Sequence, residues 1–161
     1  MRFLRSKGGY SEIRRGHDNY RRYLRSVKDR MAANAYAFAT APWHYDPQDH
    51  RCLHDSWVDE LAIYEGDDTG SGARGADILV RLLGPHHDRR VVLEYAGVSA
   101  YGLQGTLGAS AGEARTWSHG DWLLDEVTLS DSGHVLHEVE FSSGARWIIE
   151  CTDITCAVSE I

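Results

Sequence analysis

The N-terminal third of the chain carries apolar residues at the spacing of one helix face. They recur at steps of three, four and seven residues, at Ile13, Tyr20, Leu24, Val27 and Met31. Arginine and lysine fill many of the positions between them. The pattern predicts an amphipathic helix over residues 11–33, and the alanine-rich segment that follows extends the helical region to residue 40, shortly before Pro42.

From residue 56 onward the pattern changes to short β-rich runs separated by Gly, Asp and Ser, which is typical of strands and turns. WVDELAIY (57–64) and VVLEY (91–95) each place alternate apolar residues on one side. ADILVRLL (76–83) does the same, although the Gly84-Pro85 pair after it would also suit a short helix.

The C-terminal third has the clearest alternation. Three runs, DWLLDEVTL, HVLHEVEF and ARWIIECTDI, are joined by SDSG and SSG and predict a β-meander over residues 121–154. One face of its strands is apolar, with Leu123, Val127, Leu129, Val135, Val139, Phe141, Trp147, Ile149 and Cys151. The other face would be acidic and solvated, with Glu126, Glu138, Glu140, Arg146 and Glu150.

Together these elements predict one α+β domain over residues 1–161. Its N-terminal amphipathic helix would pack on an antiparallel sheet (residues 56–156) that ends in the three-stranded meander. Between the strands, residues 99–120 are rich in glycine and predict a long loop. Connections of this length without secondary structure are uncommon in compact domains and often carry function.

Composition agrees with a folded domain that needs no metal or disulfide. The chain has 161 residues, of which 42% are hydrophobic, which suffices for one core. No run approaches the roughly 18 to 20 apolar residues of a membrane span, and the first ten residues lack the apolar core of a signal peptide. We therefore expect a cytoplasmic protein with no membrane association. The three cysteines form no CxxC pair and are expected to be free, buried thiols.

The net charge of −7 conceals a division along the chain. Residues 1–30 hold ten Lys or Arg and three acids, whereas the remainder holds seven and twenty-one. The favoured interpretation is that the arginine face of the helix packs near the acidic sheet and helps to hold the helix on it. Binding of the basic helix to nucleic acid or to a membrane is the less favoured alternative.

One motif is rejected on physical grounds. GSGARG (70–75) matches the dinucleotide fingerprint, and Glu94 follows at the spacing of the ribose-binding acid. The fingerprint requires a strand that leads directly into the glycines and a long crossover helix after them. Here GDDT (66–69) intervenes, and only a short segment separates Gly75 from Gly84-Pro85. We interpret the segment as a flexible hairpin loop.

Nine histidines raise the question of a metal site, but no HxxxH, HxH or HExxH pair is expected to set two imidazoles on one face of a helix or strand. A loop-assembled site would use His54, Asp55, His119 and Asp121, and it supports an alternative hypothesis, a metal-dependent hydrolase. His137 alternates with Val135 and Val139, which places it on the core face. We interpret it as a hydrogen-bonded core histidine.

Part of the chain resembles a known class of proteins. In LHDSWV (53–58), VVLEYAGV (91–98) and GDWLLDEVTL (120–129) with its partner HEVEFSSG (137–144), the sequence is similar to small, uncharacterised bacterial β-rich proteins. These include immunity proteins that neutralise polymorphic toxins. The resemblance covers residues 53–151 and implies a non-enzymatic protein that binds a toxin and covers its active site.

The favoured hypothesis is therefore a protein-binding module without cofactor or catalytic residue, whose partner is a basic toxin domain. Its acidic or aromatic surface would include Trp117, Asp121, Trp122, Glu126, Glu138 and Glu140. Nucleic acid is not the expected partner, and the oligomeric state is left open.

Overall fold

The computed structural model describes residues 1–5, 7–67, 74–105 and 118–161. Two helices, α1 (Tyr10–Val27) and α2 (Ala33–Thr40), precede eight strands. The strands are β1 (Trp57–Asp67), β2 (Arg74–Leu83), β3 (Arg89–Ala96), β4 (Ala100–Gln104), β5 (Trp122–Leu129), β6 (Val135–Phe141), β7 (Arg146–Cys151) and β8 (Asp153–Glu160). The predicted α+β class is confirmed. None of the helices in the described ranges is long and apolar enough to cross a bilayer.

The helical region contains two helices where the sequence predicted one. α1 follows the apolar spacing and buries Tyr20, Leu24 and Val27, but it ends at Val27. A turn then reverses the chain, and α2 starts afresh at Ala33. α2 is rich in alanine and buries Ala35, Phe38 and Ala39. The Asp153 carboxylate also holds its first turn, because it accepts from the Ala35 N–H at 2.9 Å and from the Asn34 side chain at 2.8 Å.

The strands form two antiparallel four-stranded sheets, with orders β1-β2-β3-β8 and β4-β7-β6-β5. Residues 76–83, for which a short helix was the alternative, lie in β2. β1 and β2 pair as far as Asp67 and Arg74, so Arg74 and Gly75 of the GSGARG motif lie in an antiparallel strand, and residues 68–73 lie outside the described ranges. Part of the predicted loop 99–120 is the strand β4, and residues 106–117 also lie outside the description.

Two strands pass directly from one sheet into the other. β3 continues into β4 and β7 into β8, with Ala96 paired to Asp153 and Ala100 to Glu150 on either side of the bend. The predicted third strand of the meander is therefore divided at Thr152. Gly97 lies at this bend with φ of +57°, and a Cβ there would meet the Thr152 hydroxyl at 2.8 Å, so a side chain would be strained and crowded.

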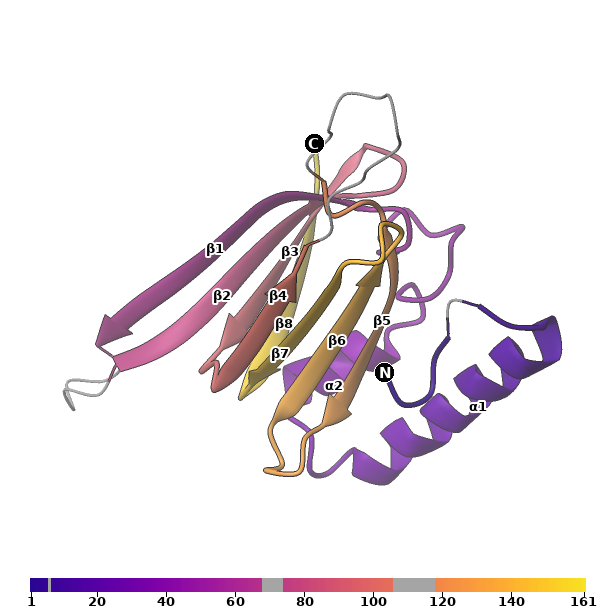
Figure 1. The fold of residues 1–161 in the computed structure, drawn as a ribbon, viewed down its shortest axis with the longest axis horizontal. Helices are drawn as coiled ribbons and strands as arrows, with labels where there is room; N and C mark the ends of the chain where they lie inside the picture. The colour runs from indigo at the N-terminus through magenta and orange to yellow at the C-terminus, as the bar shows by residue number, and fades with distance from the viewer. Residues whose placement is uncertain (6, 68–73, 106–117) are drawn as a thin grey trace.

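The core fills the space between the sheets and α2. Figure 1 shows the strands fanned from β1 to β5, with α2 behind them and α1 beside β5. Many of the alternating apolar positions predicted for the strands are buried, including Ile78, Leu93, Val139 and Ile149, but Trp57 and Ile63 of β1 are exposed. The meander interpretation of the C-terminal third is thus confirmed for β5, β6 and the β7 part of the third run.

Tyrosine hydroxyls bond the free edge of β5. The Tyr20 hydroxyl donates to the Val127 carbonyl at 2.9 Å and accepts from the Val127 N–H at 2.8 Å. Tyr23 accepts from the Leu129 N–H at 2.7 Å, and Tyr45 donates to the Asp125 carbonyl at 3.1 Å. An unpaired strand edge invites association with other chains. Here Tyr20 and Tyr23 of α1 and Tyr45 of the loop after α2 supply the missing partners.

The expected role of the arginines in holding the helix is therefore wrong. Arg14, Arg15, Arg21, Arg22, Arg25 and Lys28 are all exposed. Among the described residues, the α1 arginines form one ion pair, from Arg21 to Asp18 on the same helix. Apolar burial and the two hydroxyls of Tyr20 and Tyr23 attach α1 to β5 instead.

We expect Tyr20→Phe to lower the free energy of unfolding by about 1–3 kcal/mol, because it leaves a buried N–H and C=O of β5 without partners. Urea unfolding followed by circular dichroism measures the change. Tyr10→Phe is the matched control, since Tyr10 is 82% exposed, and it should leave stability unchanged. Equal stability of the two variants would contradict the role assigned to the hydroxyl.

Candidate functional site

A buried carboxylate, Asp125 on β5, receives hydrogen bonds from three aromatic side chains. Its Oδ2 accepts from His44 Nε2 at 2.8 Å and from His137 Nε2 at 3.0 Å. Its Oδ1 accepts from Trp122 Nε1 at 3.0 Å. All four side chains are buried, so His137 is the hydrogen-bonded core histidine that the alternation predicted.

The hydrogen bonds orient the two imidazoles. The Nδ1 atom of His44 lies 2.9 Å from the Phe38 carbonyl, so both its ring nitrogens face acceptors and both carry protons. His44 is therefore an imidazolium paired with the Asp125 carboxylate. The Nδ1 atom of His137 lies 2.8 Å from the Tyr95 hydroxyl, which can donate or accept a hydrogen bond.

Burial by itself would raise the pKa of Asp125. The positive charge of His44 and the hydrogen bonds from both imidazoles outweigh it and hold this pKa well below its usual value. Burial also raises the pKa of Tyr95 and Tyr45, so both hydroxyls stay neutral donors. Each polar atom of the network has a partner and none is open to solvent. We therefore assign the network to stability.

The four residues of the alternative metal site have other contacts. His54 Nδ1 donates to the Leu123 carbonyl at 2.8 Å, and Asp121 Oδ1 accepts from Trp57 Nε1 at 2.9 Å. The His119 ring packs edge-on against Trp147, with centroids 4.9 Å apart. The Nε2 atom of His54 lies 3.6 Å from the Oδ1 atom of Asp55. In the described ranges, no group of three or more His, Cys, Asp or Glu side chains is placed to hold a metal ion.

The predicted partner-binding residues are scattered over different environments. Trp122 is fully buried in the core, and Asp121 is bonded to Trp57. Trp117 lies outside the described residues. Glu126, expected on a solvated face, is 0% exposed because the N-terminal segment (residues 1–5) covers it. Its carboxylate accepts the backbone N–H groups of Arg2, Phe3 and Leu4 at 2.7, 2.8 and 2.8 Å.

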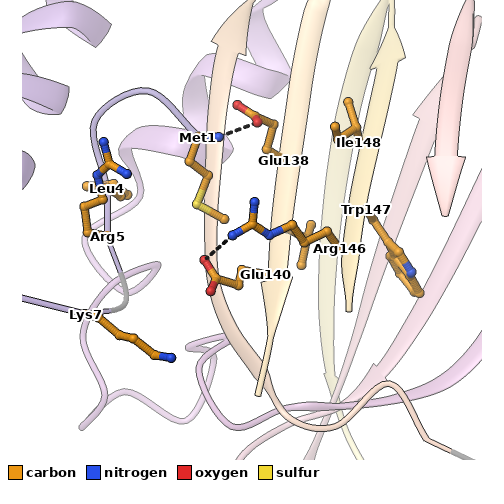
Figure 2. A pocket seen from close by; sticks show the side chains of 10 residues that line it. Met1, Leu4, Arg5, Lys7, Glu138, Glu140, Arg146, Trp147 and Ile148 are labelled. Atoms are coloured by element: carbon orange, nitrogen blue, oxygen red, sulfur yellow. Dashed lines mark hydrogen bonds and ion pairs between the residues drawn. The ribbon is translucent and has the colours of Figure 1, made fainter. Parts of the chain in front are cut away.

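Glu138 and Glu140 line a pocket of about 380 Å³ between the N-terminal segment and β6 and β7. Figure 2 shows the Met1 ammonium directed at Glu138 and the Arg146 guanidinium directed at Glu140, the latter pair at 3.9 Å. Arg5 and Lys7 line the same pocket. Glu138 is thus paired with the Met1 ammonium, and Glu140 lies at the limit of an ion pair with the exposed Arg146.

Three of the seven exposed large apolar side chains among the described residues lie on β1, at the edge of the other sheet. β1 is the outer strand of its sheet and has no partner beyond β2 among the described residues. It carries Trp57, 50% exposed, and Tyr64, 56% exposed, together with Ile63. WVDELAIY was predicted as a strand with Trp57, Leu61 and Ile63 on one side. The exposure of Trp57 and Ile63 could not be predicted from this pattern, because alternation does not show which strand lies at an edge.

The outer face of this sheet is hollowed next to Tyr64. A pocket of about 220 Å³ is lined by Tyr64, Asp77 and Glu94 and by the apolar residues Leu79 and Ala96. The register pairs Tyr64 with Asp77 and Leu79 with Glu94, so the ring and the two carboxylates come from three adjacent strands. This arrangement suits a cationic side chain, which could pair with the two carboxylates and lie over the face of an aromatic ring.

Comparisons with known proteins give no relative for this chain. No protein-family model, no curated protein and no solved structure matches it.

We expect Asp125→Asn to lower the free energy of unfolding at pH 7 by about 3–5 kcal/mol, because His44 loses the partner of its buried charge. The contribution of Asp125 to the free energy of unfolding of the wild type should also become smaller as the pH is lowered. Below about pH 4, the usual pKa of aspartate, the unfolded chain binds a proton that folded Asp125 does not, which favours unfolding. Urea unfolding at pH 7 and at about pH 3 should show a smaller pH effect in the variant.

Asp18→Asn is the control for this measurement, since Asp18 is exposed on α1. It should change stability by about 0.5 kcal/mol or less. A wild-type pH dependence retained in Asp125→Asn would show that other groups cause it.

We expect Glu126→Gln to loosen the N-terminal segment, because an amide offers one acceptor oxygen where the carboxylate offers two and adds N–H donors that face the backbone N–H groups. Amide hydrogen exchange at Phe3 and Leu4, followed by NMR, should become faster than in the wild type. Glu140→Gln, in the neighbouring pocket, should leave these two amides unchanged. Equal exchange in both variants would mean that Glu126 does not hold the segment.

Proposed function

We propose that the protein is a non-enzymatic protein-binding module that docks a basic, extended segment of a partner along β1. The observation that supports this most directly is the composition of the edge itself. An edge strand of this length, Trp57–Asp67, presents alternate N–H and C=O groups to solvent beside exposed aromatic side chains. An extended peptide can add to such an edge through main-chain hydrogen bonds, with side-chain contacts giving specificity.

The charge of the edge favours a basic partner. β1 contains Asp59, Glu60 and Glu65 and has no lysine or arginine. Arg81 of β2 is engaged by Glu60, so it does not neutralise the carboxylates nearer Tyr64. A chain of positive charge would be attracted to this edge, and another acidic copy of it would be repelled.

The pocket beside Tyr64 offers a place for one basic side chain of that segment. Asp77 Oδ1 accepts from the Gly97 N–H at 2.8 Å, and Glu94 Oε2 accepts weakly from Thr155 at 3.4 Å. No ion pair to either carboxylate is present in the described part of the chain. A lysine or arginine of the partner would therefore supply their charge partner.

Trp57 forms the second anchor, at the opposite end of β1. Its indole is held by Asp121 and packs edge-on against His87, with ring centroids 4.6 Å apart. His87 and Asp55, which flank it, both have positive φ, of 58° and 66°. Residues other than glycine adopt this conformation at a cost, and such strain collects at functional sites. Asp121, one of the predicted binding residues, would then act by orienting Trp57.

The immunity-like role is the narrower form of the proposal. The partner would be a basic toxin domain, and occupation of its surface by β1 would block its activity. The resemblance of residues 53–151 to immunity proteins supports this role. The acidic and aromatic character of the β1 edge also supports the immunity-like role. The acids of the β5–β6 face are less suited to a partner, because the N-terminal segment and Arg146 already engage them.

The docking proposal can be tested with a blocked seven-residue peptide in which arginine alternates with valine. In NMR titrations it should shift the amides of β1 and the Tyr64 and Trp57 rings. The same peptide with glutamate in place of arginine should not bind. Tyr64→Ala should weaken binding about tenfold or more, as truncation of an aromatic anchor does.

Tyr101→Ala is the matched control, because Tyr101 is also a half-exposed tyrosine on an edge strand, β4. It should bind the basic peptide as the wild type does. Equal weakening in the two tyrosine variants, or equal binding of the basic and acidic peptides, would refute docking along β1.

A further inference from the structure

We propose that the groove between α1 and α2 is a second binding site, and that its ligand is single-stranded nucleic acid. The groove has a volume of about 420 Å³ and is lined by residues of α1, of α2 and of the loop that follows α2. It lies on a different part of the molecule from β1 and has the opposite charge. The inference therefore does not rest on the proposed function.

The charge of the groove comes from arginines that the fold leaves unneutralised. Arg21 and Arg25 line it and are one helical turn apart, about 6 Å along the axis. Arg21 lies 4.0 Å from Asp18, a contact at the limit of an ion pair, and both side chains are exposed. No ion pair of Arg25 occurs in the described ranges. Asp46 is the single carboxylate of the lining.

The other walls of the groove are aromatic and apolar. Tyr36 of α2 is half-buried at the groove, and Leu24 and Ala39 lie beneath it. Pro42 and Pro47 complete the apolar surface. A nucleobase has a flat face that stacks on an aromatic ring, and the phosphates that flank it can pair with guanidinium groups. The combination of arginines one turn apart with a half-buried tyrosine in the lining matches both needs.

An acidic peptide is the competing ligand, and the groove suits it less well. Two of its walls are helices, whose backbone N–H and C=O groups bond within the helix, and the third is the loop after α2. An extended peptide would thus gain no ladder of main-chain hydrogen bonds from either helix, in contrast to the free edge of β1. Nucleic acid needs none, because its phosphates and bases bind to side chains.

His17 is the histidine that lines the groove. Burial, and then the positive charge of Arg21, lower the pKa of His17, while Asp18 opposes them. His17 is therefore neutral at pH 7 and adds no positive charge. Arg21 and Arg25 carry the electrostatic part of binding.

Fluorescence anisotropy with a labelled oligodeoxythymidylate of about a dozen nucleotides tests the proposal, with salt varied from about 50 to 200 mM. The wild type should bind, and log K should fall linearly with log salt. Arg21→Ala/Arg25→Ala should weaken binding about tenfold or more and reduce the slope by about 1.4, the value for two lost phosphate contacts on a single strand. Tyr36→Leu, which keeps an apolar side chain, should weaken binding about fivefold or more without changing the slope.

The double variant Arg15→Ala/Arg22→Ala is the matched control. It removes the same charge from the same helix, but neither residue lines the groove. It should retain most of the affinity, and thermal melts should show that all variants are folded. Equal loss in the two double variants, or no binding by the wild type at the lower salt, would overturn the proposal. So would competition by poly-glutamate as effective as that by unlabelled oligonucleotide, which would assign the groove to acidic peptides.

Discussion

The buried ion pair between Asp125 and His44 links the main parts of the structure. Asp125 belongs to β5, His44 lies in the loop after α2 and bonds back to the Phe38 carbonyl of α2, and His137 belongs to β6. Tyr95 extends the network to β3 in the other sheet. One carboxylate thus joins the helix and both sheets. A buried charge is costly, so its partners must stay in place, and this restricts how the sheets and α2 can pack.

β5 is consequently bonded on three sides. Asp125 faces the core, the neighbouring Glu126 faces the opposite side and holds the N-terminal segment, and tyrosine hydroxyls bond the free backbone edge. The polar groups of this strand are occupied within the chain. The surfaces left for a partner are those that the fold does not use for itself, namely the β1 edge and the arginines of α1.

A β-bulge explains why Trp122, one of the predicted binding residues of β5, was misplaced. Strict alternation puts Trp122 on the same side as Glu126 and away from the core. The register of β5 against β6 shifts between Trp122 and Leu124, and this reverses the side of Trp122 relative to the residues after it. Trp122 and Asp125 therefore share the core face. Nothing in the run DWLLDEVTL indicates that an extra residue lies in the strand at this point.

The sequence by itself determined the class of the fold, the helical region, most strands, the C-terminal meander and the core position of His137. These follow from periodicity and turn residues, which depend on neighbours a few positions apart. Tertiary structure decided which strands lie at an edge, the bend that divides the predicted last strand of the meander at Thr152, and the partners of each charge. Asp125 and Glu126 are adjacent acids with similar sequence surroundings. One became the partner of a buried imidazolium and the other a binding site for three backbone N–H groups, because residues more than eighty positions away pack against them.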